Sequence, residues 1–167
     1  PESIMNPILV MCMGLGYLFN MYRGKPLVRE GGVVIMTHPT YREFHPVHPP
    51  SYVDFFEQVR PDTTDPVEMG KKWEKQYAED EWYRHLYRTS YAYHGVHPFY
   101  MWYWGSNAMN HAGRIIIVGG DVKAVHRMGF TPASTLNDAF EIASDVVGRQ
   151  PTITHLHNPP VVMADVL

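Results

Sequence analysis

The chain has 167 residues, which is enough for one domain with a sizeable core and too short for two complete domains. Its formal net charge of −3, with no run of basic residues, removes any electrostatic reason to expect nucleic acid as a partner. No apolar stretch reaches the ~20 residues that span a bilayer, so we also expect no membrane segment.

The single cysteine, Cys12, lies in an apolar run and cannot form an internal disulfide. This indicates a reduced, cytoplasmic setting, with Cys12 as a small core residue rather than a nucleophile. The chain begins at Pro1 without an initiator methionine, and we therefore expect it to be a piece of a longer protein.

Aromatic side chains are abundant, with eleven Tyr, seven Phe and four Trp, alongside ten His and ten Met. Aromatic residues bury large areas, while the polar tips of Tyr and Trp need a partner or water. The composition predicts a wide cleft or an interface. The aromatic segment from Trp73 to Trp104 is more typical of a core or interface than of a ligand cage.

The first part of the chain predicts a βαβ unit. An apolar strand at 8–13 is followed by a Gly14-Leu15-Gly16 turn, a helix-like segment through Lys25, a glycine break and a second strand at 33–37. Short apolar runs without polar alternation are typical of strands buried on both faces of a parallel sheet. In such sheets the ligand crevice lies beyond the carboxyl ends of the strands.

Further elements follow a proline-rich loop at 38–50. The pattern predicts, in order, helix 52–59, a helix from Pro66 towards Tyr93 that is either kinked or divided into two helices near Asp80, helix 99–111, strand 114–119, helix 122–128, helix 136–147 and strand 152–156. The alternation predicts an α/β fold: a three-layer Rossmann-like sandwich with a mainly parallel sheet of about four strands. A long helical insertion separates strands two and three, a position where insertions usually carry function.

The glycines at Gly14 and Gly16 invite a dinucleotide-binding interpretation. The third glycine of that fingerprint would fall at Phe19, and no acidic residue ends the second strand, so a tight turn before a helix explains them adequately. They still permit the close approach of some ligand. Arg23 and Lys25 could bind a carboxylate or phosphate, or could lie on a solvated basic helix face.

Histidines follow two of the predicted strands. His38, His45 and His48 form one cluster, and His155 and His157 form another. Converging imidazoles could make a metal or proton-transfer site, for example from His45, His48 and His155, whereas surface or hydrogen-bonding histidines are the simpler alternative. Asp121, after Gly119-Gly120, could bind a ligand hydroxyl or cap the next helix.

Several short motifs resemble one family. The stretch from Met11 to Met36 combines G-x-G-Y, N-x-Y, a downstream lysine and G-G before a strand. Gly95-Val-His97-Pro98 precedes a helix, Arg114 to Gly120 forms a strand, and Met128-Gly129-Phe130 precedes a further helix start. In this order the motifs resemble the carboxy-terminal domain of the nickel-pincer lactate racemases and their uncharacterised relatives.

The resemblance implies that residues 1–167 are a single α/β domain, the carboxy-terminal half of a two-domain isomerase that is inactive alone. The amino-terminal domain would hold the nickel-pincer nucleotide on a lysine and supply the metal-ligand and acid/base histidines. The reaction implied is racemisation or epimerisation of a small 2-hydroxy acid in the interdomain cleft, with the cofactor taking and returning a hydride.

The resemblance also implies site residues. Arg23 and Lys25 are the expected catalytic cations; the residues expected to bind substrate or cofactor are Gly14, Gly16, Tyr17, Asn20, Tyr22, His38, His97 and Gly120. Arg23 matches a family glutamine, and Lys25 falls one residue before the family's lysine, where this chain has Pro26. These departures point to a different substrate. The alternative is a nonenzymatic Rossmann-like ligand-binding or docking domain whose aromatic face packs on another domain.

Overall fold

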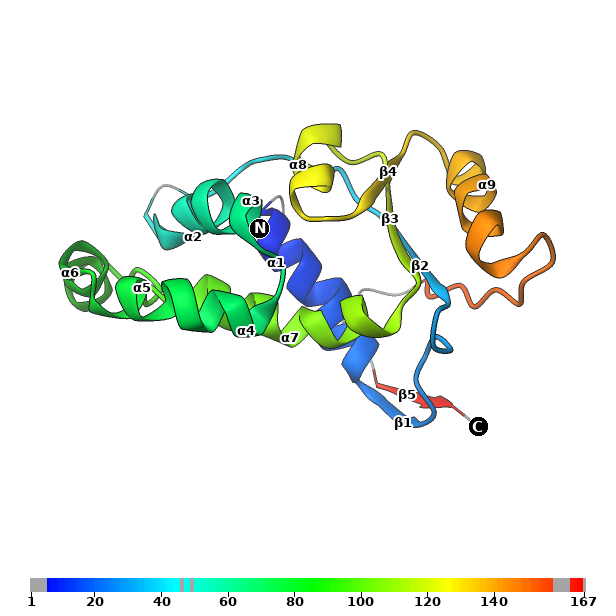
Figure 1. Ribbon diagram of the computed structural model, residues 1–167, viewed down its shortest axis with the longest axis horizontal. Helices are drawn as coiled ribbons and strands as arrows, with labels where there is room; N and C mark the ends of the chain where they lie inside the picture. Colours follow the sequence, from blue (N-terminus) through cyan, green and yellow to red (C-terminus); the bar gives the residue numbers. More distant parts are fainter. Residues whose placement is uncertain (1–5, 46, 49, 158–162, 167) are drawn as a thin grey trace.

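The computed structural model describes residues 6–45, 47–48, 50–157 and 163–166 (Figure 1). It is an α/β structure with many helices and two small parallel sheets. The elements are α1 (Pro7–Met11), η1 (Cys12–Leu18), β1 (Tyr22–Gly24), β2 (Val33–Thr37), α2 (Pro50–Asp54), η2 (Phe55–Val59), α3 (Arg60–Asp62), α4 (Pro66–Met69), η3 (Gly70–Glu74), α5 (Lys75–Glu79), α6 (Glu81–Thr89), α7 (His97–His111), β3 (Arg114–Val118), α8 (Val122–Arg127), β4 (Thr131–Ala133), α9 (Leu136–Val147) and β5 (Ala164–Val166), where η marks wider, π-helical turns.

The larger sheet has the order β2-β3-β4, with every pair parallel. Val33 pairs with Arg114 and Thr37 with Val118, so the predicted strands at 33–37 and 114–119 and their parallel arrangement are confirmed. Helices cover both faces. Ile116 packs with α9 on one face, while Ile115 and Ile117 join the larger core formed with α1, η1, α7 and α8.

The expected strand at 8–13 is wrong, because these residues form the helix α1 and the start of η1. The Asn6 side chain accepts hydrogen bonds from the backbone N–H groups of Ile8 (3.0 Å) and Leu9, and Pro7 occupies the first helical turn. These are the normal signals of a helix start. The uninterrupted apolar run reflects burial of this helix against α7 rather than a strand buried on both faces.

Gly14 and Gly16 lie inside η1 and do not form a turn. Both allow close packing: a Cβ at Gly14 would meet the Met36 sulfur, and one at Gly16 would lie 2.8 Å from Cδ1 of Trp104. Gly105 of α7 has the same role opposite Met11. The expected βαβ unit is therefore replaced by a helix pair, α1–η1 against α7, packed on the sheet.

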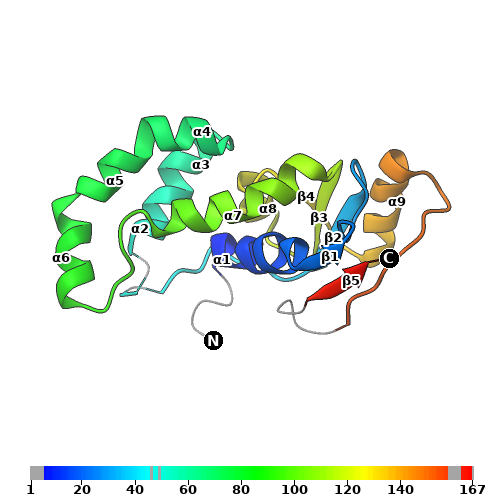
Figure 2. The same ribbon diagram turned by 90° about the horizontal axis from the view of Figure 1, so that it is seen from below.

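The long insertion between β2 and β3 is helical, as expected. Its elements α4, η3, α5 and α6 form an arm that curves away from the sheet (Figure 2). Of the two alternatives expected near Asp80, the division into two helices is confirmed, since α5 ends at Glu79 and α6 begins at Glu81. The Asp80 side chain between them accepts from the backbone N–H of Tyr83 at 2.9 Å. The predicted helices near 52–59, 99–111, 122–128 and 136–147 are also present.

A second sheet pairs β1 with β5, in parallel. Neither strand was predicted, nor was β4. The expected strand at 152–156 is wrong, because these residues form no regular element and are exposed, Ile153 by 61%. Only two of the four expected strands exist, so a four-stranded Rossmann-like sandwich is not confirmed. Within the described residues, no helix combines the length and apolar character needed to cross a membrane.

Candidate functional site

The structure distributes the ten expected site residues over three places. The first, at η1 and β1, holds Gly14, Gly16, Tyr17, Asn20, Tyr22, Arg23 and Lys25. The second, at the carboxyl end of β2 and β3, holds His38 and Gly120, and the third, at the start of α7, holds His97.

An exposed surface of aromatic rings and amides lies where η1 meets α7. We call Tyr17, Asn20, Trp104 and Asn107 the amide surface. The ring of Tyr17 stacks on that of Trp104, with centroids 4.9 Å apart. The Asn20 amide donates to the Trp104 carbonyl oxygen at 3.0 Å and accepts from Asn107 at 2.9 Å. These bonds hold Asn20 in one orientation. Trp104 and Asn107, three residues apart on one helix face, were not expected as part of the site.

Arg23 already binds a carboxylate of the chain itself. Its Nε and one terminal nitrogen donate to the two oxygens of Asp165, at 2.5 and 2.8 Å. The hydrogen bond that Arg23 donates to Asp165 raises the pKa of Arg23. Both side chains are largely exposed. Arg23 could bind a substrate carboxylate only after this pair opens, so its catalytic role stays a prediction.

Lys25 follows β1 directly, and its backbone N–H donates to the Val166 carbonyl oxygen at 3.3 Å. The side chain is exposed, and no residue that the structure describes forms an ion pair with its ammonium group. Of the two expected cations, Lys25 is therefore the one that can meet an anion without first losing a partner. Its catalytic role also stays a prediction.

His38 follows β2 and is held by its own loop. The backbone N–H of Thr40 donates to Nδ1 of His38 at 2.9 Å, so the neutral ring carries its proton on Nε2. Partial burial lowers the pKa of His38. Gly120 serves packing, because a Cβ there would lie 2.7 Å from a methyl group of Val125. Asp121 caps α8 by accepting from the Ala124 N–H at 2.8 Å, as one of the two interpretations expected.

His97 occupies the first turn of α7, between two tyrosines. The hydroxyl of Tyr52 and Nδ1 of His97 form a hydrogen bond of 2.6 Å, and the Tyr93 ring stacks on the imidazole with centroids 4.3 Å apart. Burial lowers the pKa of His97 and raises that of the fully buried Tyr52. His97 is thus a neutral imidazole, with Nε2 as its remaining hydrogen-bonding atom.

The residues of the three places lie on different elements. Asn20 binds Trp104, which lies seven residues along α7 from His97, and at 1.5 Å per residue this is roughly 10 Å. His38 follows the carboxyl end of β2, whereas β1 and Lys25 adjoin the loop before this strand. Gly14 is nearer to His38, because it packs against Met36 of β2. Figure 1 shows β1 at the lower edge of the molecule, and α8 and α2, which carries Tyr52, along its upper edge. The expected residues do not form one site within the described chain.

The histidines do not assemble a metal site either. The rings of His45 and His48 stack with centroids 4.4 Å apart, and those of His155 and His157 lie 5.7 Å apart. Among the described residues, no group of three His, Cys, Asp or Glu side chains could hold a metal ion. The proposed set of His45, His48 and His155 is therefore wrong. Burial raises the pKa of Cys12 to about 11, so its thiol is also no ready ligand. These residues do not fit a nickel site.

A charged pocket lies at the carboxyl end of the larger sheet and was not expected from the sequence. It has a volume of about 350 Å³ and is lined by Arg42, Phe56, Glu57, Asp121, Lys123, Ala124 and Arg127. These residues come from the loop after β2, from η2, and from α8 with its cap. No sequence motif links the residues that line the pocket, because Arg42 and Arg127 are far apart in the sequence and come together only in the folded chain.

No family model matches the chain, and neither a curated protein nor a solved structure matches it.

Proposed function

We propose that the chain is the carboxy-terminal domain of a lactate racemase-like enzyme, a racemase or epimerase of a 2-hydroxy acid that works by cofactor-mediated hydride transfer. The chain would contribute cationic and polar groups to a cleft shared with an amino-terminal domain of the same protein. The described residues offer no donor set for nickel. The proposal therefore assigns the nickel-pincer nucleotide to that other domain.

The observation that carries this proposal is the exposed ammonium of Lys25, which has no ion-pair partner among the described residues and lies in the segment that begins at the amide surface. A 2-hydroxy acid needs a fixed cation for its carboxylate and polar groups that orient the rest of the molecule. Lys25 provides the cation, and the oriented Asn20 amide and the Tyr17 ring provide neighbouring groups from the same segment. Burial of this surface against a second domain would strengthen each of these interactions.

The finer fold and location are part of the same proposal. A Rossmann-like three-layer arrangement is supported by helices on both faces of the β2-β3-β4 sheet. A cytoplasmic location is supported by the single, free cysteine.

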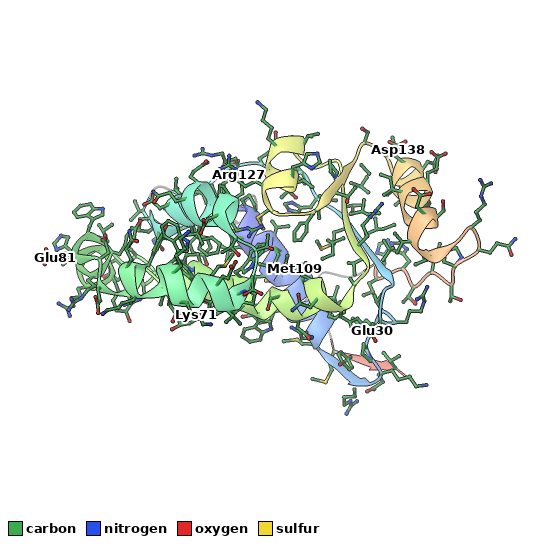
Figure 3. The ribbon with its side chains drawn as sticks, in the orientation of Figure 1. Glu30, Lys71, Glu81, Met109, Arg127 and Asp138 are labelled. Atoms are coloured by element: carbon green, nitrogen blue, oxygen red, sulfur yellow. The ribbon has the colours of Figure 1, made fainter. Side chains whose placement is uncertain are left out.

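The test uses the full-length protein that contains this chain, loaded with cofactor and given single enantiomers of lactate and of longer 2-hydroxy acids. Chiral chromatography follows appearance of the opposite enantiomer. Lys25→Ala should lower kcat/KM at least about 100-fold, because a buried charged hydrogen bond to the substrate is lost. Lys71→Ala is the matched control, since Lys71 is an exposed lysine on the helical arm, away from β1 (Figure 3).

Two outcomes would contradict the proposal. One is an unchanged kcat/KM in the Lys25→Ala enzyme. The other is turnover of any 2-hydroxy acid by residues 1–167 alone, without a partner domain.

One observation favours a nonenzymatic docking domain as the second candidate. Large aromatic side chains are exposed on α6 and just after it: Trp82 by 62%, Tyr87 by 54% and Tyr91 by 92%. Exposed aromatic groups gathered on one element often mark an interface. Electron density for a nucleotide or a 2-hydroxy acid beside Lys25 in soaked crystals would favour the enzymatic function. Absence of ligand density there would favour the docking function.

A further inference from the structure

The charged pocket lies where parallel sheets usually bind ligands. Arg42 belongs to the loop that leaves the carboxyl end of β2, and Asp121 and Lys123 follow the carboxyl end of β3. In open α/β sheets the loops beyond these ends form the ligand crevice. Its volume of about 350 Å³ suits a small molecule.

Two arginines share one carboxylate in this pocket. Nε of Arg42 donates to one oxygen of Glu57, and a terminal nitrogen of Arg127 donates to the other at 2.7 Å. Figure 3 shows Arg127 at the end of α8, and its guanidinium also lies 5.5 Å from the ring centroid of Phe56. Arg127 and Glu57 are each only about one-third exposed, at 35% and 33%, so solvent screens this group less than it would a surface pair.

The charged pocket has an excess of positive charge, and some of its N–H donors have no acceptor among the described residues. Arg42, Lys123 and Arg127 outnumber the carboxylates of Glu57 and Asp121 by one. Asp121 already caps α8. Each arginine donates through a single nitrogen, and among the described residues neither the other guanidinium nitrogens nor the Lys123 ammonium has a hydrogen-bond partner.

We propose that the charged pocket binds a small organic carboxylate, held by the remaining guanidinium nitrogens of Arg42 and Arg127 with Lys123 close by. The planar fork of arginine matches a carboxylate, and a single negative charge neutralises the excess of one positive charge. This site is separate from Lys25 and does not depend on the proposed racemase function.

The test titrates the full chain with propionate, which has the carboxylate but no 2-hydroxyl group, in a buffer without phosphate or other carboxylates. Calorimetry should show saturable binding to one site. The Nε–H resonances of Arg42 and Arg127 should shift in NMR spectra. Inorganic phosphate forms a second arm of the experiment and should bind more weakly. Lys71→Ala, on the exposed helical arm, should bind propionate like the unaltered chain.

Some variants of the charged pocket should raise the affinity for propionate and others should lower it. Glu57→Gln removes a competing negative charge but keeps an amide oxygen for the arginines, so propionate affinity should rise about three- to fivefold. Arg127→Met should lower it at least about tenfold. Arg42→Met should also weaken binding, and because this side chain is 54% exposed, that variant remains informative if Arg127→Met does not fold. Arg88→Met, on the exposed face of α6, is the control and should change nothing.

The proposal would be overturned by non-saturable binding, by phosphate binding more tightly than propionate, or by a Glu57→Gln chain whose affinity is unchanged. The last result would mean that the two arginines and Glu57 only stabilise the fold.

Discussion

His97 illustrates how burial determines the protonation of a single residue. Its ring lies between Tyr52, which is fully buried, and Tyr93, and its pKa is lowered from the usual value of 6.5. Charging this ring would require bringing a cation into an aromatic environment. The sequence motif placed His97 just before a helix, whereas it is the first residue of α7. Nothing in the motif indicated that Tyr52, 45 residues earlier, would be its hydrogen-bond partner.

This environment predicts a specific acid response. The unfolded chain takes up a proton on His97 at a higher pH than the folded chain does. The contribution of His97 to the free energy of unfolding is therefore fully present above pH 6.5 and is lost as the pH falls through the lowered pKa of the folded state. Each unit of pKa difference is worth about 1.4 kcal/mol.

Urea denaturation between pH 7.5 and about pH 5 measures this effect. His97→Gln keeps a hydrogen-bonding group for Tyr52 but cannot titrate, so its stability should fall less steeply with acid than that of the unaltered chain. His38, whose pKa is also lowered, would account for part of the remaining slope. Identical slopes for the two proteins would show that His97 is not held neutral by the fold.

Arg60 is a second residue whose environment the sequence did not predict. It is buried, its guanidinium lies 3.7 Å from the Trp102 ring centroid, and it donates to the carbonyl oxygens of Thr63 (2.7 Å) and Arg127 (3.2 Å). Burial lowers its pKa to about 9, so it is still charged at neutral pH. It joins the ends of α3 and α8 and thereby positions Arg127 at the charged pocket.

At the scale of elements, replacing two glycines by alanine should change the free energy of unfolding in opposite directions. Gly95, just before α7, is buried against α5, and an added Cβ would meet the Tyr77 carbonyl oxygen and lie 3.1 Å from Tyr83. Gly70 is in a helix with helical backbone angles, and its nearest neighbour would be 3.4 Å away. We expect Gly95→Ala to lower the free energy of unfolding by about 1–3 kcal/mol, because backbone atoms cannot move aside cheaply.

Gly70→Ala should instead raise the free energy of unfolding by about 0.5–1 kcal/mol, because alanine is the better helix former. Urea denaturation of the Gly95→Ala and Gly70→Ala variants and of the parent chain measures the two changes in the free energy of unfolding. A loss of stability in both, or in neither, would contradict the packing described for these helices.

The element predictions succeeded where local signals were strong. The strands at 33–37 and 114–119 and the helix capped by Thr135 and Asp138 could be predicted because short β-branched runs and a capping box act locally. The run 8–13 failed because a short apolar segment looks alike in a buried strand and in a buried helix. The Asn6-Pro7 start was the signal that distinguished them.

The remaining failures arise from long-range pairing. β1, β4 and β5 have three residues each and exist only because a partner strand lies beside them. Residues 152–156 have a strand-like composition but no neighbouring strand to pair with. The charged pocket was missed for the same reason, because Glu57 and Arg127 are 70 residues apart in the chain.

At the scale of the whole molecule, the helical arm carries much of the exposed aromatic surface. Trp82 stacks on His85 of the same helix, with centroids 5.7 Å apart, and does not enter the core. The arm lies at the opposite end of the molecule from α9 (Figure 2). This arrangement fits a docking role for the arm and a ligand-binding role for the sheet and the amide surface.

If the proposed amino-terminal domain docks on the arm, Trp82→Ala should lower the affinity for that domain, produced separately, at least about tenfold, since aromatic groups dominate interface energies. Stability of the chain should hardly change, because Trp82 is exposed. Arg84→Ala, on the same helix, is the matched control. Calorimetric titration of one domain with the other measures the affinities of both variants and of the unaltered chain. Equal affinities for all three proteins would place the interface elsewhere.

The pairing of β1 with β5 also determines when, during synthesis, the segment around β1 can reach its folded conformation. Arg23 and Asp165 are 142 residues apart, and every other described element lies between these two strands or before them. During synthesis the chain emerges amino end first, so the core of helices and the β2-β3-β4 sheet can form while β1 still has no partner. The segment that bears Lys25 can therefore acquire its final backbone only after residues 164–166 have left the ribosome, later than the helices and the β2-β3-β4 sheet.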